Sequence, residues 1–277
     1  MNAILIIAGK EIRDGLRNRW VMAITALLAL FALTLAFLGA APTGAVRVGA
    51  LTVTVVSLSS LSIFLLPLVA LLLSFDAIVG EMAGGTLGLL LAYPVARWQV
   101  VIGKFLGHSA ILALATTIGY GCAGAAIAAS AGSAGSDGGW GGFSLLIVSS
   151  ILLGAAFIAI GYVISVTVGD RAAAAGFAIG VWLVFVLIYD MALLGALVAD
   201  RGRLLSAQIV NWLLLFNPAD AYRMLNLGAT PGARLFSGMA GLAGDLRYSP
   251  AVMAAALGLW TAVPLGIAIV LFQRRQI

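Results

Sequence analysis

The sequence predicts an all-α integral membrane protein with six transmembrane helices, and three observations support this fold class. Of the 277 residues, 63% are hydrophobic and only 9% are charged, and the mean hydropathy is +1.15. Several uninterrupted apolar runs reach the length of about 20 residues that a helix needs to cross the hydrocarbon core of a membrane. The 34 glycines suit close helix packing in lipid, where small residues let backbones approach. This composition excludes a soluble domain.

Residues 1–19 predict an amphipathic connecting helix that lies along the membrane surface. Its apolar face carries Ile4, Leu5, Ala8, Ile12 and Leu16, and its polar face carries Lys10, Arg13, Asp14 and Arg17. The apolar run from Trp20 to Leu38 follows directly. This run is long for the apolar region of a signal peptide, and more spans come after it, so we expect an uncleaved first transmembrane helix.

A single six-helix transmembrane domain is expected over residues 20–277. The other five spans lie at about residues 51–75, 100–129, 143–168, 172–198 and 251–272. The tight turn Gly169-Asp170-Arg171 predicts that the fourth and fifth spans are antiparallel neighbours. Residues 199–250 form a more polar outer loop. Its apolar stretch, residues 204–216, is too short to span, so we expect a re-entrant or interfacial helix that ends at Asn217-Pro218.

The distribution of cations predicts the orientation of the chain. Six spans place both termini on one side, and the cations of the short segments gather on that same side. These nine cations are Lys10, Arg13, Arg17, Arg19, Arg97, Lys104, Arg171, Arg274 and Arg275. Both termini are therefore expected in the cytoplasm. The formal charge of +5 reflects such residues near membrane ends, without a concentrated basic tract, so no nucleic-acid partner is expected.

Residues 80–104 collect a carboxylate, a glycine pair, a proline and two cations between two apolar runs, and we interpret them as a docking element. Gly84 and Gly85 are expected to break the helix that leaves the second span, because glycine tolerates backbone angles that other residues avoid. Thr86 is then expected to cap a new short helix. The leucines at helical spacing in this helix are Leu87, Leu90 and Leu91.

The docking element is expected to end where the third span begins. Pro94 suits the first turn of that helix, where its missing N–H costs nothing. Arg97 and Lys104 flank the start of the span. Glu81 is expected to pair with Arg97 or with a cation of a partner protein. The alternative is an ordinary loop between spans with its usual positive charges.

The sequence predicts no catalytic site. The pairs Gly9-Lys10 and Gly103-Lys104 lack the following Ser or Thr and the upstream glycine of a phosphate-binding loop, so no nucleotide site is encoded. This chain is expected to bind no cofactor, and if ATP is used, another chain binds it with Mg²⁺. One histidine and one cysteine leave no hydrolytic triad and no zinc motif such as H-E-x-x-H.

Three residues within the spans have two interpretations each. His108 and Cys122 are either metal ligands, because imidazole and thiolate suit copper, or packed or interface residues. They are 14 residues apart in one span, which corresponds to about 21 Å along a helix, so they cannot share an ion within one chain. Asp190 lies in an apolar run, where an ionisable group is costly unless it is paired or hydrated. It either serves a pathway or interface, or snorkels near the outer membrane face.

The docking element contains the most specific motif of the chain. Glu81, Gly85-Thr86-Leu87, Pro94, Arg97 and Gly103-Lys104 look like the coupling-helix pattern of ABC-2 type transporter permeases, which reads E, then GTL, then P-x-x-R and GK. The resemblance covers nearly the whole chain. Within that family, Asn217 to Arg223 and Leu225 to Gly228 are similar to the outer-loop pattern of a subgroup that serves nitrous oxide reductase maturation.

The resemblance implies a type V exporter fold in the bacterial inner membrane. The partners that it implies are a second copy of the chain, a separate cytoplasmic ATPase, a periplasmic solenoid protein and membrane lipid, and it leaves room for a copper chaperone. It also implies a coupling role for Glu81, Gly85, Thr86, Leu87, Leu90, Pro94 and Arg97, and a connecting-helix role for Lys10, Arg13 and Arg17.

Three functions stay open at this stage. The first is a permease that exports or delivers a copper- or sulfur-related species for copper-site assembly, or another substrate of the same transporter family. The second is a mechanical relay that drives a periplasmic partner without moving a solute, which would need no metal ligand. The third, an unrelated membrane enzyme, is disfavoured by the missing catalytic residues.

Overall fold

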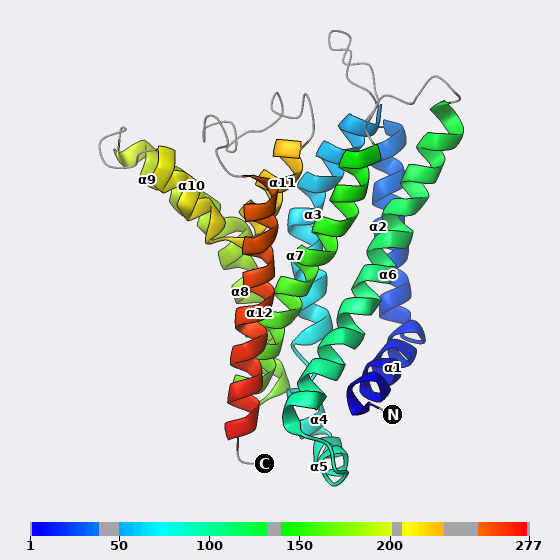
Figure 1. Ribbon diagram of the computed structural model, residues 1–277, viewed down its shortest axis with the longest axis vertical. Helices are drawn as coiled ribbons and strands as arrows, with labels where there is room; N and C mark the ends of the chain where they lie inside the picture. The colour runs from blue at the N-terminus through cyan, green and yellow to red at the C-terminus, as the bar shows by residue number, and fades with distance from the viewer. Residues whose placement is uncertain (1, 39–49, 132–139, 201–206, 230–248, 276–277) are drawn as a thin grey trace.

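The computed structural model describes residues 2–38, 50–131, 140–200, 207–229 and 249–275, and this part of the chain contains helices and no strand. Figure 1 shows an elongated bundle whose long helices run roughly along its long axis, with both chain ends and the short helix α5 at the same end. Five helical segments are long and apolar enough to cross a membrane, and a sixth is added if the bent pair α1 and α2 forms one span. The all-helical membrane fold is thus confirmed.

The chain begins with α1 (Ala3–Leu16), which meets α2 (Arg19–Leu38) at a bend of 67°. The next elements are α3 (Ala50–Ser74), α4 (Val79–Ala83), α5 (Thr86–Leu91), α6 (Arg97–Ala131) and α7 (Trp140–Thr167). After them come α8 (Arg171–Leu183), the π-helical segment η2 (Val184–Ile188), α9 (Tyr189–Asp200), α10 (Ala207–Leu215), α11 (Pro218–Ala229) and α12 (Pro250–Arg274). The spans therefore begin and end within a few residues of the predicted positions.

Helix α1 packs against α6 through a face that shares only Ala8 with the apolar face that we expect on the membrane surface. The face that α6 covers carries Ile7, Ala8, Glu11 and Gly15, whereas Leu5 and Leu16 are exposed. The cause lies on α6, where a Cβ atom at Gly103 would lie 2.8 Å from Ile7 and one at Gly107 would lie 2.5 Å from Glu11. The two glycines bring the helices close together, so the covered face of α1 includes a carboxylate.

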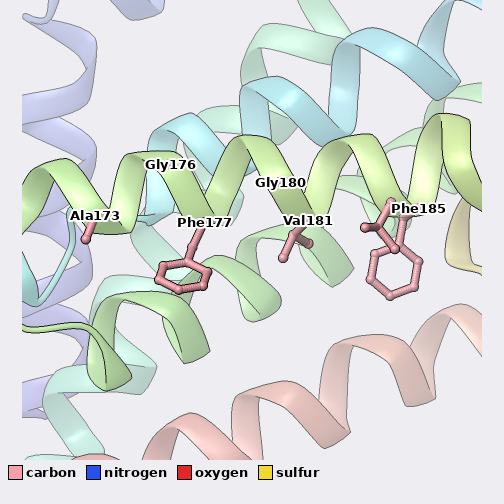
Figure 2. A pocket seen from close by; sticks show the side chains of 7 residues that line it. Ala173, Gly176, Phe177, Gly180, Val181 and Phe185 are labelled. Atoms are coloured by element: carbon pink, nitrogen blue, oxygen red, sulfur yellow. The ribbon is translucent and has the colours of Figure 1, made fainter.

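The fifth span is one helix interrupted by a π-helical turn. Asp170 caps its start, because the Asp170 carboxylate accepts hydrogen bonds from the backbone N–H groups of Ala172 and Ala173, both at 2.9 Å. The tight turn after α7 is as predicted, and α8 contacts α3 as well as α7. Within η2 the Tyr189 N–H bonds to the Val184 carbonyl, five residues back. Figure 2 shows Phe177, Val181 and Phe185 projecting from the same side of this span.

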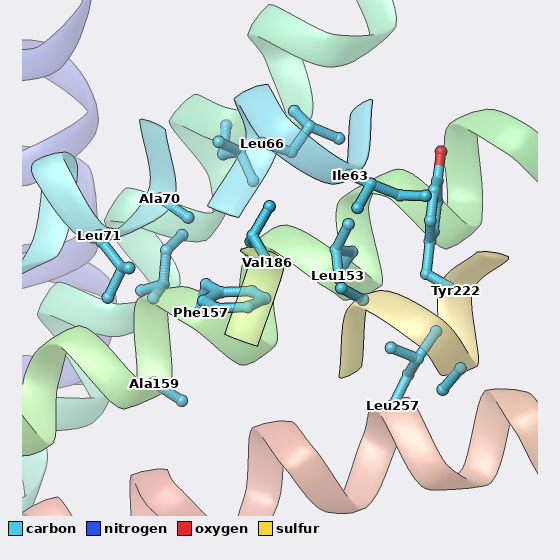
Figure 3. Packing of buried hydrophobic residues seen from close by; sticks show 14 of the residues in the cluster. Ile63, Leu66, Ala70, Leu71, Leu153, Phe157, Ala159, Val186, Tyr222 and Leu257 are labelled. Atoms are coloured by element: carbon cyan, nitrogen blue, oxygen red, sulfur yellow. The ribbon is translucent and has the colours of Figure 1, made fainter. Parts of the chain in front are cut away.

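The centre of the bundle is formed by α3, α7 and α12, with α11 against them. Leu66 of α3, Phe157 of α7 and Leu257 of α12 are fully buried, and Figure 3 shows Phe157 among the apolar side chains of this core. Apolar packing inside a membrane is driven by van der Waals contact, because lipid is as apolar as the core. Close fit therefore matters, and a Cβ atom at Gly154 would collide with Leu112.

Helices α10 and α11 form a hairpin near the end of the bundle opposite to α5 (Figure 1). The turn between them lies at Phe216-Asn217, as predicted for the end of the short apolar helix. Asn217 is fully buried and its side chain donates a hydrogen bond of 2.8 Å to the Phe185 carbonyl of η2. The hairpin turn thus enters the bundle, which favours the re-entrant interpretation over the interfacial one.

Candidate functional site

The candidate site is built on α4 and α5, which project at the end of the bundle that carries both termini (Figure 1). Gly85 separates the two short helices with φ at +69°, a left-handed conformation that glycine adopts without steric cost. The prediction that Thr86 caps α5 is wrong. Gly85 occupies the N-cap position without a side-chain bond, and the Thr86 hydroxyl instead donates to the Glu81 carbonyl of α4 at 3.3 Å.

The base of this element is fixed to α7. The backbone N–H groups of Ile78 and Val79, at the start of α4, donate to the Ser165 hydroxyl at 2.9 and 3.1 Å. The first N–H groups of a helix have no partner within it, so a buried helix start needs such a bond. Leu87 of α5 is also buried. The element is thus held by its base and by one leucine.

The tip of the element exposes large apolar side chains. Leu89 is 70% exposed, Tyr93 is 69% exposed and Trp98 is 39% exposed, and we call these three residues the docking surface. Leu90, which the sequence favoured, is only half-buried and Leu87 is hidden. Helical spacing identified the leucines that face the protein, whereas a docking surface needs those on the opposite side. Tyr93 could have been identified from the sequence as an aromatic residue that directly follows the short helix in a polar segment.

Pro94 does not lie where the sequence predicted, whereas Arg97 begins α6 as predicted but has a different bonding partner. Pro94 lies before α6 rather than in its first turn, at the centre of a γ-turn closed by a 2.7 Å hydrogen bond from the Val95 N–H to the Tyr93 carbonyl. Arg97 does not pair with Glu81. Its guanidinium donates to the carbonyls of Phe272, Gln273 and Arg275 at the end of α12. Arg97 therefore caps the last helix.

A group of charged side chains lies beneath the docking element, and we call it the charge cluster: Lys10, Glu11, Glu81, Lys104 and His108. Lys104 Nζ of α6 lies 2.7 Å from Glu11 Oε1 of α1 and 2.7 Å from Glu81 Oε1 of α4. His108 Nε2 lies 3.5 Å from Glu11 Oε2. Lys104, Glu11 and His108 are buried. The sequence did not reveal this cluster because its members come from three elements.

The electrostatics of the cluster favour the charged form of Glu11. Burial pushes the pKa of Glu11 upward, but the hydrogen bonds from His108 and Lys104 outweigh it and hold the pKa well below its usual range. Burial lowers the pKa of Lys10, yet Glu11, Glu81 and Asp14 raise it on balance. Within the described part of the chain, Glu81 Oε2 is buried and has no hydrogen-bond partner.

His108 and Cys122 lie on the same helix, as predicted, and neither is part of a ligand group. His108 Nδ1 lies 2.9 Å from the Tyr162 hydroxyl, so both nitrogens of the ring face protein groups. Cys122 is exposed and unbonded. Among the residues that the structure describes, no three His, Cys, Asp or Glu side chains come together as a metal site would require.

Asp190 lies at the other end of the bundle and is paired. Its carboxylate is 2.8 Å from the guanidinium of Arg223 in α11, and Arg223 also lies 2.7 Å from Asp220. The same region anchors the end of α10, since Tyr189 donates to the Leu213 carbonyl at 2.6 Å. An ionisable residue inside a span needs such a partner. The sequence predicted that Asp190 could be paired but did not identify Arg223 as its partner. Asp190 thus fastens the hairpin to the fifth span.

The fold and these contacts belong to a membrane transport protein. Residues 5–277 match the ABC-2 family of transporter proteins, so the chain belongs to that family. It is a multi-pass permease, the membrane subunit of an ABC transporter rather than its ATPase.

The similarity extends to individual relatives. The chain is 46% identical over 275 residues, 99% of both chains, to the probable ABC transporter permease protein NosY of Stutzerimonas stutzeri. It is 47% identical over 277 residues, the full length of both chains, to the protein of the same name from Pseudomonas aeruginosa.

Proposed function

We propose that this permease couples ATP hydrolysis by a separate, NosF-like ATPase to the export or delivery of a copper- or sulfur-related species for nitrous oxide reductase copper-site assembly. The observation that carries the coupling part is the docking surface, because Leu89 and Tyr93 expose apolar area on an element that is anchored at its base. The similarity to NosY proteins supports the reductase part. ATP and Mg²⁺ bind to the ATPase.

The ends of the bundle are assigned accordingly. The α5 end and both termini face the cytoplasm, and the α10–α11 hairpin faces the periplasm, where a NosD-like solenoid protein binds and a copper chaperone delivers or receives cargo. The cations at the α5 end support this orientation through the positive-inside rule.

A homodimer completes the transport unit, and the fifth span supplies its contact face. Ala173, Gly176, Phe177, Gly180, Val181, Val184 and Phe185 line an apolar groove of about 530 Å³ (Figure 2). Phe177 is 60% exposed, and a Cβ atom at Gly176 or Gly180 would have no neighbour within 4 Å. Small residues one turn apart with open space beside them suit a second helix in lipid.

The docking surface is tested by co-purification. Leu89→Ala and Tyr93→Ala are each expected to weaken ATPase binding at least tenfold, as truncation of a buried apolar anchor does. Trp140→Ala is the matched control, an exposed aromatic residue at the start of α7 on the opposite end. Wild-type ATPase recovery with both tip variants would contradict the assignment.

A mechanical relay that moves no solute is the second candidate. Copper(I) prefers thiolates and thioethers, and the chain has one cysteine and seven methionines, of which Met224 and Met253 are buried in the core. His108 is occupied by Tyr162 and Glu11. Sealed vesicles that contain the purified complex distinguish the two. ATP-dependent accumulation of copper or of a low-molecular-weight thiol supports transport, and its absence together with intact reductase maturation supports the relay. Accumulation of an unrelated solute in place of both would indicate a general ABC-2 exporter.

A further inference from the structure

The strongest unexplained feature is the position of Lys104. It is only 3% exposed, yet it carries a charge and pairs with carboxylates from two different elements at the same distance of 2.7 Å. Glu11 belongs to the connecting helix α1, and Glu81 belongs to α4, directly before the docking surface. Lys104 therefore joins the part of the chain that meets the ATPase to the part that leads into the first span.

Stability alone does not account for this arrangement. Buried ion pairs contribute little compared with apolar residues of the same volume, because desolvation offsets the attraction. Gly103 and Gly107 already bring α1 and α6 into close contact. Apolar side chains in place of the charged ones could therefore pack between the two helices. Removing one member of a buried pair is costly, since it leaves a charge without a partner. The members of such a cluster therefore stay paired when the helices move, with the same partner or with another one within reach.

We infer that Lys104 is a positioning residue that transmits displacement of α4 and α5 to α1. This inference rests on the proposed docking of an ATPase on α5. Ser165 holds the first N–H groups of α4 on α7, so a push on α5 moves the rest of α4, which includes Glu81. Glu81 acts on Lys104, and Lys104 acts on Glu11. Helix α1 passes the movement to α2 through the bend of 67° between them.

The cluster has room for a second arrangement of charges. Glu81 Oε2 is buried and has no hydrogen-bond partner among the described residues. Lys10 Nζ is 3.2 Å from Glu11 and 3.8 Å from Glu81, and its half-exposed side chain can move between the two. Glu81 can therefore exchange partners when α4 moves without leaving a carboxylate unpaired, as a switching element requires.

The test uses the purified complex with its ATPase and two spin-label positions. Gly9→Cys reports on α1 and has no neighbour within 4 Å of an added Cβ atom, and Ala83→Cys reports on the exposed end of α4. Both are made in a Cys122→Ser background. In the wild type, nucleotide trapping should shift the distance between the two copies at both positions. In Glu81→Gln, the Ala83 label should still shift, while the shift at Gly9 should fall to less than half.

Glu81→Gln keeps Lys104 paired with Glu11, so it leaves no lone buried charge. Asp14→Asn is the control, because Asp14 is an exposed carboxylate of α1 that contacts Lys10 at 3.5 Å, and it should leave both shifts unchanged. If Glu81→Gln does not fold, the triple variant Glu11→Gln, Glu81→Gln and Lys104→Met removes all three charges and serves the same purpose.

In Glu81→Gln or the triple variant, a shift of the Ala83 label together with a shift of the Gly9 label as large as in the wild type would overturn the role of Lys104. A wild-type permease that retains no ATPase overturns the proposed function and the inference together. Retention of the ATPase by wild type and by Glu81→Gln, with loss of the Gly9 shift alone, supports both.

Discussion

At the α5 end of the bundle, two arginine side chains donate hydrogen bonds to the ends of helices. Arg97 donates to the last carbonyls of α12, and Arg275 donates to the carbonyls of Val166 and Val168 at the end of α7. The last carbonyls of a helix have no partner inside it and attract cations. Cations that the sequence assigns to orientation, and in the case of Arg97 also to the docking element, thus cap helices as well.

Arg97→Ala should destabilise the protein. The side chain makes hydrogen bonds to three carbonyls and lies 5.9 Å from the centre of the Phe272 ring. Loss of a charged donor to carbonyls that are at most part-buried costs about 1 to 2 kcal/mol, which thermal unfolding in detergent can measure. Arg13→Ala, on the exposed side of α1, should change the unfolding temperature little. An equal effect of both would argue against the capping role.

Asp220 should make the stability depend on pH. Burial raises the pKa of this carboxyl from 3.8 to about 7, and Asp190 adds to the effect, although Arg223 opposes it. A carboxyl whose pKa rises on folding stabilises the fold most below its unfolded pKa, and this contribution is lost as the pH rises through the folded pKa. The unfolding temperature should therefore fall between about pH 4 and pH 7, and Asp220→Asn should remove this slope. A slope that persists in the variant would contradict the assignment.

The sequence identifies residues that need a partner but not the partner itself. A carboxylate in an apolar run predicts pairing for Asp190, yet Arg223 is 33 residues further on and in a different element. Glu81 was expected to pair with Arg97 or with a cation of a partner protein, whereas within this chain it pairs with Lys104. Such choices depend on which helix faces meet, and that is a property of tertiary packing.

At the scale of helices, the length of the apolar runs was sufficient to locate the spans. The 25 residues of α3 and the 28 residues of α7 coincide with apolar runs whose composition is typical of transmembrane helices. The π-turn in the fifth span was not predictable, because Val184 to Ile188 is as apolar as its flanks. It is stabilised from outside by Asn217, whose amide donates to the Phe185 carbonyl.

The face of α8 should decide dimerisation. Gly176→Leu combined with Gly180→Leu fills the groove with two branched side chains, so the second copy can no longer approach. Size-exclusion chromatography with light scattering should show a loss of dimer. Gly121→Leu is the control, because this glycine of α6 is equally open. A double variant that remains a wild-type dimer would remove this face from consideration.

At the scale of the whole molecule, the orientation predicts which positions are accessible from each side of the membrane. In a Cys122→Ser background, Gly84→Cys should be protected from an impermeant thiol reagent in intact cells, because the proposed orientation places the docking element in the cytoplasm. Gly135→Cys, which lies outside the described residues and between the predicted third and fourth spans, should react. Equal reactivity of the two would contradict six spans with both termini inside.

The π-turn also affects which changes in chain length the protein can accept. A π-turn contains one residue more than the α-helix that would replace it. Deleting one residue between Val184 and Ile188 would restore a regular helix and leave α9 facing the same way. Deleting one residue elsewhere in that span would rotate every later side chain by about 100° and turn Asp190 away from Arg223. The five residues of η2 are thus the place in the fifth span where a single-residue deletion should be tolerated.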